Sequence, residues 1–238
     1  MCRNALGGSL VSITDEEPVI ACQGLVKTYA DGDSVVTAVD RFSANFLRGE
    51  MTAITGPSGS GKTTLLNLIA AIDYPDDGEV WAQGSRLSSL SRAEQADYRA
   101  GYAGIVHSES NLLPMLTVYE NLSLALSLQK LAEAEIDSRI RRALESVGID
   151  SLAHRLPGAL SSGERARAAL ARAVAMHSAV IIADEPTAHL DHESAGEIAQ
   201  VLRTIAESGT CVVVATHDFA VSDVATRVIT LVDGRAVT

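Results

Sequence analysis

Cysteine is scarce in this sequence, and long apolar runs are absent. The three cysteines, Cys2, Cys22 and Cys211, are odd in number and far apart, so neither a disulfide framework nor a zinc site is indicated. Cys22 and Cys211 are predicted to be small core residues in strands. No apolar run approaches the ~20 residues that span a bilayer, and residues 1–14 lack a basic segment followed by an apolar one. The sequence therefore predicts a soluble chain without a secretory leader.

Basic residues are outnumbered, with 19 Lys and Arg against 30 Asp and Glu and a formal net charge of −11. This balance makes a broad nucleic-acid surface unfavourable, and we expect no nucleic-acid partner. The 238 residues, 47% of them hydrophobic, are enough for a full core. We expect one domain over residues 17–238, with residues 1–16 as a polar, mobile tail.

A glycine-rich stretch, GPSGSGKT, follows the short apolar run of residues 51–55. It fits G-x-x-x-x-G-K-[ST], a loop whose backbone N–H groups hold phosphate oxygens between a strand and a helix. Lys62 adds a charge for the β- and γ-phosphates, and Thr63 offers a hydroxyl to Mg²⁺. The helix predicted to begin near Gly61 directs its positive end at the same anion. The candidate nucleotide-binding residues here are Gly56, Pro57, Ser58, Gly59, Ser60, Gly61, Lys62, Thr63 and Thr64.

Residues 19–46, ahead of this loop, are predicted to form short strands, and the alternation over residues 35–39 favours antiparallel pairing. Tyr29 lies in this region. Its ring could stack on a purine base, or it could be an ordinary half-buried tyrosine of a strand.

Residues from about 91 to 157 are predicted to be mainly helical. Ser91 with Glu94, and Thr117 with Glu120, form capping boxes. We therefore expect a helical subdomain at about residues 91–160, inserted between the phosphate-binding loop and the next strand. Apolar residues recur there at helical spacing at Ile136, Ile140, Leu144 and Val147.

Carboxylates follow the unbroken apolar run of residues 179–183, which is typical of a parallel strand covered on both faces. Such strand ends lie on the edge where α/β sheets bind ligands. Asp184 is the candidate Mg²⁺ ligand and Glu185 the candidate for activating water, and His217 follows a second apolar run. Taken singly, these residues could be a strand-to-loop stop and a surface histidine. With Lys62 they predict phosphoryl transfer.

Residues 160–164, LSSGE, open a predicted helix with a capping box at Ser161 and Glu164. This stretch is either only a well-capped helix or a helix N-terminus that presents N–H groups and a hydroxyl to an anion.

In this combination the sequence resembles the ATP-binding subunits of ABC transporters, from about residue 19 to 238. The amino-acid sequence at residues 111–114 and 183–187 is most similar to that of the bacterial lipoprotein-release, macrolide-export and haem-export branch. The resemblance rests on residues 56–63 as Walker A, 180–185 as Walker B, 160–164 as the signature, 188–191 with Asp191 as the D-loop, His217 as the switch histidine and Tyr29 as the base-stacking aromatic.

The resemblance implies an α/β P-loop NTPase (RecA-like) core with an N-terminal antiparallel β subdomain and a helical subdomain inserted between Walker A and Walker B. It also implies a head-to-tail dimer in which Ser161, Gly163 and Glu164 complete the partner's ATP site. The cofactors would be ATP and Mg²⁺. A membrane permease would receive the movement and hold the chain at the cytoplasmic face of the membrane.

Three positions depart from the family pattern. Ser108 stands where the family has its loop glutamine, Ser162 replaces the first signature glycine, and Ala166 replaces a glutamine of this branch. Because serine is too short for the glutamine's reach, hydrolysis could be slow. The expected function is an ATPase subunit of an exporter-like ABC transporter. The alternatives are an ATP-operated regulatory switch and a low-activity subunit of a heteromeric complex; a stand-alone kinase or GTPase is disfavoured.

Overall fold

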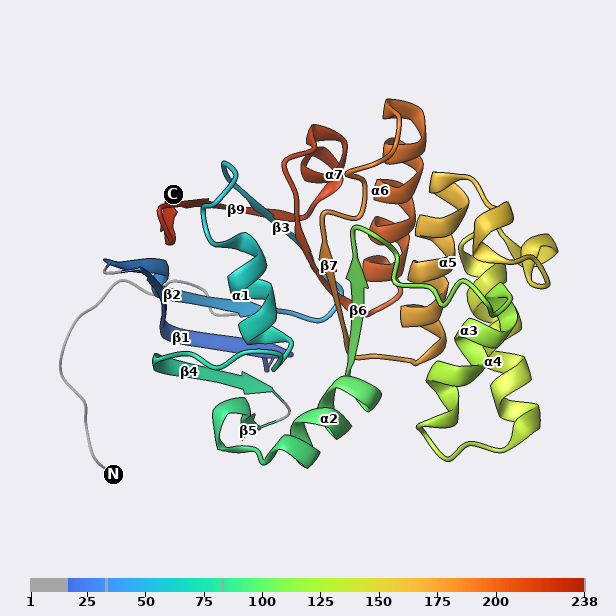
Figure 1. The fold of residues 1–238 in the computed structure, drawn as a ribbon, viewed down its shortest axis with the longest axis horizontal. Coiled ribbons are helices and arrows are strands. Elements are labelled where there is room, and N and C mark those ends of the chain that lie inside the picture. Colours follow the sequence, from blue (N-terminus) through green and yellow to red (C-terminus); the bar gives the residue numbers. More distant parts are fainter. Residues whose placement is uncertain (1–16, 33, 83, 238) are drawn as a thin grey trace, which may run out of the picture.

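The structure is a computed structural model that describes residues 17–32, 34–82 and 84–237. The fold contains two sheets, and helices pack on both faces of the larger sheet (Figure 1). This arrangement confirms the predicted α/β class. Cys2 and the tail predicted over residues 1–16 lie outside the described residues.

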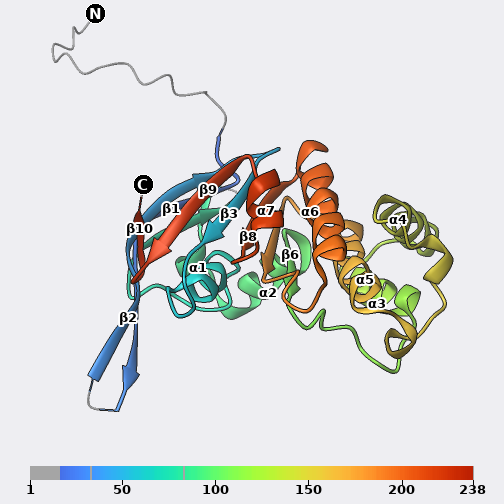
Figure 2. The same ribbon diagram turned by 90° about the horizontal axis from the view of Figure 1, so that it is seen from above.

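The smaller sheet is antiparallel and has the strand order β2-β1-β4-β5. Its members are β1 (Ile20–Asp31), β2 (Ser34–Phe46), β4 (Asp77–Ala82) and β5 (Ser85–Arg86). The β1–β2 hairpin projects well beyond the rest of the sheet (Figure 2). The antiparallel pairing expected for residues 19–46 is confirmed.

The larger sheet has the order β10-β9-β3-β8-β7-β6, and all its pairings are parallel except β9 with β10. The central strands are covered on both faces because they are runs of Val, Ile and Ala, and all five residues of β8 are buried. Cys22 and Cys211 are buried in strands, as expected. The six strands are β3 (Met51–Thr55), β6 (Ala103–His107), β7 (Val180–Asp184), β8 (Cys211–Ala215), β9 (Arg227–Val232) and β10 (Arg235–Val237).

Helix α1 (Lys62–Ile69) lies between the two sheets and contacts β1, β2, β7 and β8. On the opposite face of the larger sheet, α5 (Ser162–Ala175) packs on β6 and α6 (His192–Glu207) packs on β3 and β8, while the short α7 (Phe219–Val224) packs on α6 (Figure 1). Helices α3 (Val118–Ser127) and α4 (Glu133–Ser146) lie outside α5 and pack on it. The buried apolar residues accordingly form two core clusters, one on each face of the larger sheet.

The prediction of a mainly helical stretch over residues 91–157 was incomplete. Helix α2 (Arg92–Gly101), α3 and α4 do form, and both predicted capping boxes are present. However, residues 103–107 form β6, which pairs with β7 in the larger sheet. This strand is short and directly follows a helix, so its pattern gave no separate signal. Gly104 lets it approach α5, because a Cβ there would lie 2.8 Å from that of Ala173. The position of a subdomain boundary stays a prediction.

Candidate nucleotide-binding site

The glycine-rich loop connects β3 to α1, as its motif requires. Gly56 has φ of 143° and Gly61 φ of 98°, backbone conformations that side chains other than glycine's rarely allow. A Cβ on Gly56 would collide with the carbonyl oxygen of Leu231, and one on Gly61 with that of Ala38. The loop therefore curls tightly against two neighbouring strands, and only glycine fits at these two positions.

Lys62, the first residue of α1, is 8% exposed and folds back over the loop. Its Nζ donates to the carbonyl oxygens of Gly56, at 2.8 Å, and of Pro57, at 3.0 Å. Ser60 Oγ is buried in the same loop and has no hydrogen-bond partner among the described residues. A buried hydroxyl is normally satisfied, so this loop has hydrogen-bonding capacity to spare for an anion.

An open pocket of about 630 Å³ lies over this loop. Besides the loop it is lined by Tyr29, Ala38, Glu185 and His217. The pocket therefore brings together the predicted phosphate-binding loop, the predicted aromatic and two of the three residues predicted from later strand ends. Its residues from the loop are Gly56, Pro57, Ser58, Gly59, Ser60, Gly61, Lys62, Thr63 and Thr64.

Tyr29 stands at the rim of the pocket on β1, and 41% of it is exposed. Its hydroxyl donates to Asp73 Oδ2 at 2.8 Å, and Lys27 Nζ lies 5.3 Å from the centroid of its ring. Partial burial and the bond to Asp73 raise the pKa of Tyr29, so the phenol remains a donor at neutral pH. The ring is thereby fixed beside the pocket, where an aromatic face can stack on a base.

The candidate metal-binding residues join α1 to β7. Thr63 Oγ1 donates to Asp184 Oδ2 at 2.9 Å, while Asp184 Oδ1 is buried and has no hydrogen-bond partner among the described residues. Burial raises the pKa of the Asp184 carboxyl, although the bond from Thr63 opposes this shift. A divalent cation would satisfy the second carboxylate oxygen, and a hydroxyl with a carboxylate is a donor set that Mg²⁺ prefers. The residues present therefore fit Mg²⁺.

Glu185 and His217 meet at the carboxyl edge of the larger sheet. Glu185 has φ of 48°, and its N–H donates to the carbonyl oxygen of Ala215 at 2.9 Å. His217 Nδ1 lies 2.9 Å from Glu185 Oε2, close enough for an ion pair but not aligned as a hydrogen bond. The imidazole is 71% exposed and the glutamate only 22%. The pair can orient a water molecule above the phosphate-binding loop.

The signature residues lie elsewhere on the chain. Ser161 is the N-cap of α5, and its hydroxyl accepts from the N–H of Glu164 at 3.2 Å in the predicted capping box. Asp191 caps α6, where Oδ1 accepts from the N–H of Ser194 at 3.0 Å. Neither these residues nor Gly163 line the pocket over the loop. Within one chain, the structure therefore does not bring the signature to the phosphate-binding site.

Sequence reasoning missed two supports of the pocket. The carbonyl oxygen of Ala38 is the surface against which Gly61 packs, and Asp73 anchors both Tyr29 and Lys27, with its Oδ1 2.9 Å from Lys27 Nζ. An alanine in a strand and an aspartate in a turn give no motif. Asp73 is identified as a support of the pocket only by its hydrogen bond with Tyr29, which lies about 45 residues away in the sequence.

The fold and this geometry define a P-loop nucleotide-binding protein. The sequence profile of the ABC transporter family matches residues 39–188. The lipoprotein-releasing system ATP-binding protein LolD of Chromohalobacter salexigens is 34% identical over 94% of this chain and 95% of its own length. The chain therefore belongs to the ABC transporter family, as the sequence predicted.

Two further relatives agree with this assignment. The macrolide export ATP-binding/permease protein MacB of Pasteurella multocida is 36% identical over 93% of this chain, which spans about a third (34%) of that protein. The ATP-binding cassette MJ0796, solved as a dimer in a post-hydrolysis state with ADP and Pi, matches with a TM-score of 0.84 and 34% identity over 92% of this chain and 97% of its own. Both the predicted branch and the predicted fold are confirmed. Among the described residues, no helix is long and apolar enough to cross a membrane.

Proposed function

We propose that this chain binds ATP with Mg²⁺ and hydrolyses it to drive a separate membrane permease, as an exporter-like subunit. The observation that carries the proposal is one pocket that gathers Lys62 and the phosphate-binding loop, Tyr29, and the Glu185–His217 pair, with the Thr63–Asp184 contact at the same loop. These are the parts that phosphoryl transfer to water requires.

Each residue has a distinct proposed task. The loop N–H groups hold the phosphates, and Lys62 neutralises part of their charge. To do so, Lys62 exchanges its hydrogen bonds to the loop carbonyl oxygens for bonds to the phosphates. Thr63 and Asp184 would hold Mg²⁺, which neutralises charge on the phosphates when bound. Glu185 orients and deprotonates the attacking water, and His217, beside it, is placed to contact the γ-phosphate. Tyr29 stacks on the base.

The exposure of the signature supports a head-to-tail dimer. Ser161 is exposed at the start of α5, and the signature does not reach the pocket of its own chain. A second ATP-binding subunit, either a copy of this chain or a related one, would supply Ser161, Gly163 and Glu164 to this ATP, and Asp191 would lie near the same interface. This assignment rests on the position of α5 and on the family.

An exposed apolar turn supports docking on a permease at the cytoplasmic face of the membrane. Met115 is 87% exposed and Leu113 47% exposed in the segment that leads into α3. Asn121, 4% exposed, fixes this segment: its Oδ1 accepts from the N–H of Leu113 at 2.7 Å and its Nδ2 donates to Leu116 O at 3.0 Å. A rigidly held apolar surface is suited to a protein partner.

The test is steady-state ATPase activity of the purified chain, alone and with the membrane partner that co-purifies with it. Turnover that rises with the partner and is lost in Glu185→Gln is the expected result. Lys62→Ala should lose nucleotide binding. ATP affinity unchanged in Lys62→Ala, or turnover unchanged in Glu185→Gln, would overturn the proposed roles.

There are two alternative candidate functions: an ATP-operated regulatory switch and a low-activity subunit of a heteromeric complex. The observation that favours them is Ser108, which lines a different pocket together with Ser162 and does not line the one over the phosphate-binding loop. ATP binding with single-turnover hydrolysis near zero would support the low-activity subunit. Coupled hydrolysis without movement of any cargo would support the switch. Ser108→Gln should raise coupled turnover if this position limits the rate.

A further inference from the structure

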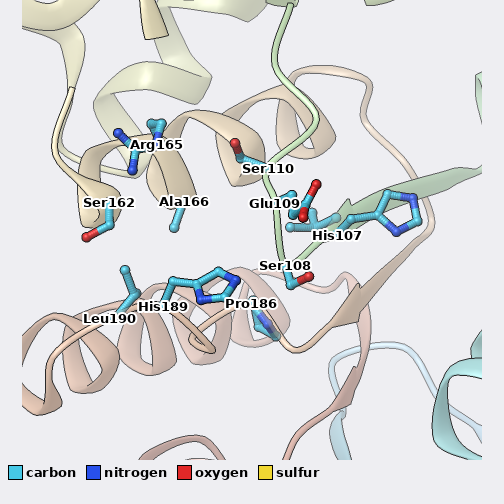
Figure 3. A pocket seen from close by; sticks show the side chains of 11 residues that line it. His107, Ser108, Glu109, Ser110, Ser162, Arg165, Ala166, Pro186, His189 and Leu190 are labelled. Atoms are coloured by element: carbon cyan, nitrogen blue, oxygen red, sulfur yellow. The ribbon is translucent and has the colours of Figure 1, made fainter. Parts of the chain in front are cut away.

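A pocket of about 490 Å³ lies at the edge of the larger sheet opposite to the nucleotide-binding site. It is found where β7 and β8 begin, whereas Asp184 and His217 lie at the edge where these parallel strands end. Its walls come from the last turns of α4, α5 and α6, the turns that follow α5 and α6, and the loop before β3. The pocket shares no lining residue with the one over the phosphate-binding loop, nor with the one in Figure 3 that Ser108, Ser162 and Ala166 line.

The inner wall of this pocket is apolar. Ala173, Ile181 and Ile205 are only 2%, 1% and 7% exposed, and the half-buried Val174 packs against the same core cluster. Cavities of roughly 300–1,000 Å³ with apolar walls and a few polar groups are typical of small-molecule sites. The pocket is therefore suited to the apolar body of a small molecule.

Arg48 brings a positive charge to the pocket. Its side chain is exposed, its Nη1 donates to the carbonyl oxygen of Gly209 at 3.3 Å, and it pairs with no carboxylate among the described residues. No Asp or Glu lines the pocket, although acidic residues outnumber basic ones by 30 to 19 in the chain. Burial and the nearby Arg139 and Arg142 lower the pKa of His177, another lining residue, so its neutral ring has one N–H to donate at neutral pH.

The carboxyl ends of α5 and α6 oppose an anion here, because each carries a partial negative charge. Donors within the chain already satisfy carbonyl oxygens at both ends. Val174 O accepts from the N–H of His177 at 2.9 Å, and Ala206 O accepts from the N–H of Gly209 at 2.8 Å. A guanidinium that bonds an anion directly is therefore the stronger influence.

Ser178 shows independently that the pocket has hydrogen-bonding capacity to spare. This residue lines the pocket and is 7% exposed, and its Oγ has no hydrogen-bond partner among the described residues. It lies against Gly104 of β6, which has no side chain to bond it. Because buried hydroxyls are normally satisfied, this one is unusual, and it can turn toward a bound molecule without losing a hydrogen bond.

We propose that this pocket binds a small amphipathic carboxylic acid, with its carboxylate on Arg48 and its apolar body against Val174, Ile181 and Ile205. A guanidinium bonds a carboxylate through two parallel N–H groups, and the apolar wall excludes water from the rest of the molecule. Ser178 can donate to a polar atom of the bound acid. The site lies at the far end of β7 and β8 from the phosphate-binding loop, so the acid does not compete with a nucleotide. This proposal does not rest on the proposed function.

The test is a titration of the full chain with sodium octanoate, followed by isothermal titration calorimetry. A non-hydrolysable ATP analogue fills the phosphate-binding loop, which also binds anions, and sodium chloride at matched ionic strength is the reference. We expect saturable binding of octanoate. Octanol and octylammonium should bind roughly tenfold more weakly because they lack the carboxylate, and acetate should not bind measurably because it lacks the apolar body.

Two positions in the pocket test how the charge is recognised. Arg48→Gln should weaken octanoate affinity roughly tenfold, because it removes a charge-assisted hydrogen bond. Thr204 lines the pocket from an exposed position on α6, so changes there do not disturb the core. Thr204→Glu should also weaken octanoate binding roughly tenfold, because it adds a like charge to the wall. Thr204→Gln is its matched control, of the same size without the charge, and should leave the affinity unchanged.

Two further controls lie away from the pocket. Arg86→Gln removes a guanidinium from β5, where Arg86 pairs with Glu79 at 2.7 Å, and Met115→Ser removes the exposed side chain to which an amphiphile could adhere without a site. Both variants should keep their affinity for octanoate. The affinity for the ATP analogue reports folding in every variant, and Thr204→Glu carries the test if Arg48→Gln does not fold.

Three results would overturn the proposal: no saturable binding of octanoate, equal affinities for octanoate and octanol, or binding that is unchanged in both Arg48→Gln and Thr204→Glu. No step of the test uses ATP hydrolysis. A chain that binds octanoate but hydrolyses no ATP would retain this site and lose the proposed function, and the opposite pair of results would do the reverse.

Discussion

Replacing Asn121 with alanine should loosen the apolar turn that we assign to the permease. In the structure Asn121 is nearly buried and bonds to four backbone groups. Two of these groups keep other partners, because Leu113 O also accepts from the N–H of Leu116 and Thr117 O from that of Asn121 itself. The N–H of Leu113 and the carbonyl oxygen of Leu116 have no other hydrogen-bond partner among the described residues, so each would be left unpaired.

The expected cost follows from these two groups. Leaving a buried polar group without a partner costs about 1–3 kcal/mol, and the half-exposed position of Leu113 lets water recover part of it. We therefore expect the free energy of unfolding to fall by about 2–3 kcal/mol, which corresponds to a Tm roughly 5–10 °C lower for a chain of this size. Met115 should lose its fixed position at the same time.

Urea unfolding measures the first effect, and ATPase activity with and without the permease measures the second. We expect activity of the chain alone to be retained and the stimulation by the permease to fall. Asn121→Asp is a useful comparison, since it keeps the acceptor for Leu113 and loses the donors. A stability change below about 0.5 kcal/mol, or full stimulation by the permease in the alanine variant, would refute the reasoning.

Three other predictions concern the candidate site. Gly61→Ala should abolish ATP binding, because φ of 98° and the nearby carbonyl of Ala38 leave no room for a methyl group; ATP affinity near that of the unaltered chain in equilibrium binding would contradict this. Tyr29→Ala should weaken ATP binding roughly tenfold while Tyr29→Phe changes it little, and equal losses would assign the effect to the bond with Asp73 instead of stacking. Asp184→Asn should stabilise the Mg²⁺-free chain at neutral pH. The raised pKa of Asp184 means that ionisation disfavours the folded state, so the gain is complete above the folded pKa and should shrink as the pH falls from the folded pKa toward the unfolded one. Thermal melts at pH 4 and 7 without nucleotide check this, and an equal gain at both would contradict it.

Much of the candidate site could be predicted because its residues belong to short, contiguous patterns. The spacing of Gly56 to Thr63 requires a strand before it and a helix after it, and both are present. Asp184, Glu185 and His217 each follow an apolar run, and strand ends in a parallel sheet meet at one edge. Strand β6 was missed because five residues directly after a helix carry too little periodicity to be distinguished from it.

The sequence by itself determined the phosphate-binding loop, the three capping boxes and the buried parallel strands, because these depend on residues within a few positions of one another. Tertiary structure alone decided which distant groups share a cavity. It placed Asp73 within hydrogen-bond distance of the Tyr29 hydroxyl, separated Ser161 from the phosphate-binding loop of its own chain, and brought Ser108, Ser162 and Ala166 to one pocket. The physical reason is that such contacts depend on how helices and sheets pack across one another, and no local spacing encodes that packing.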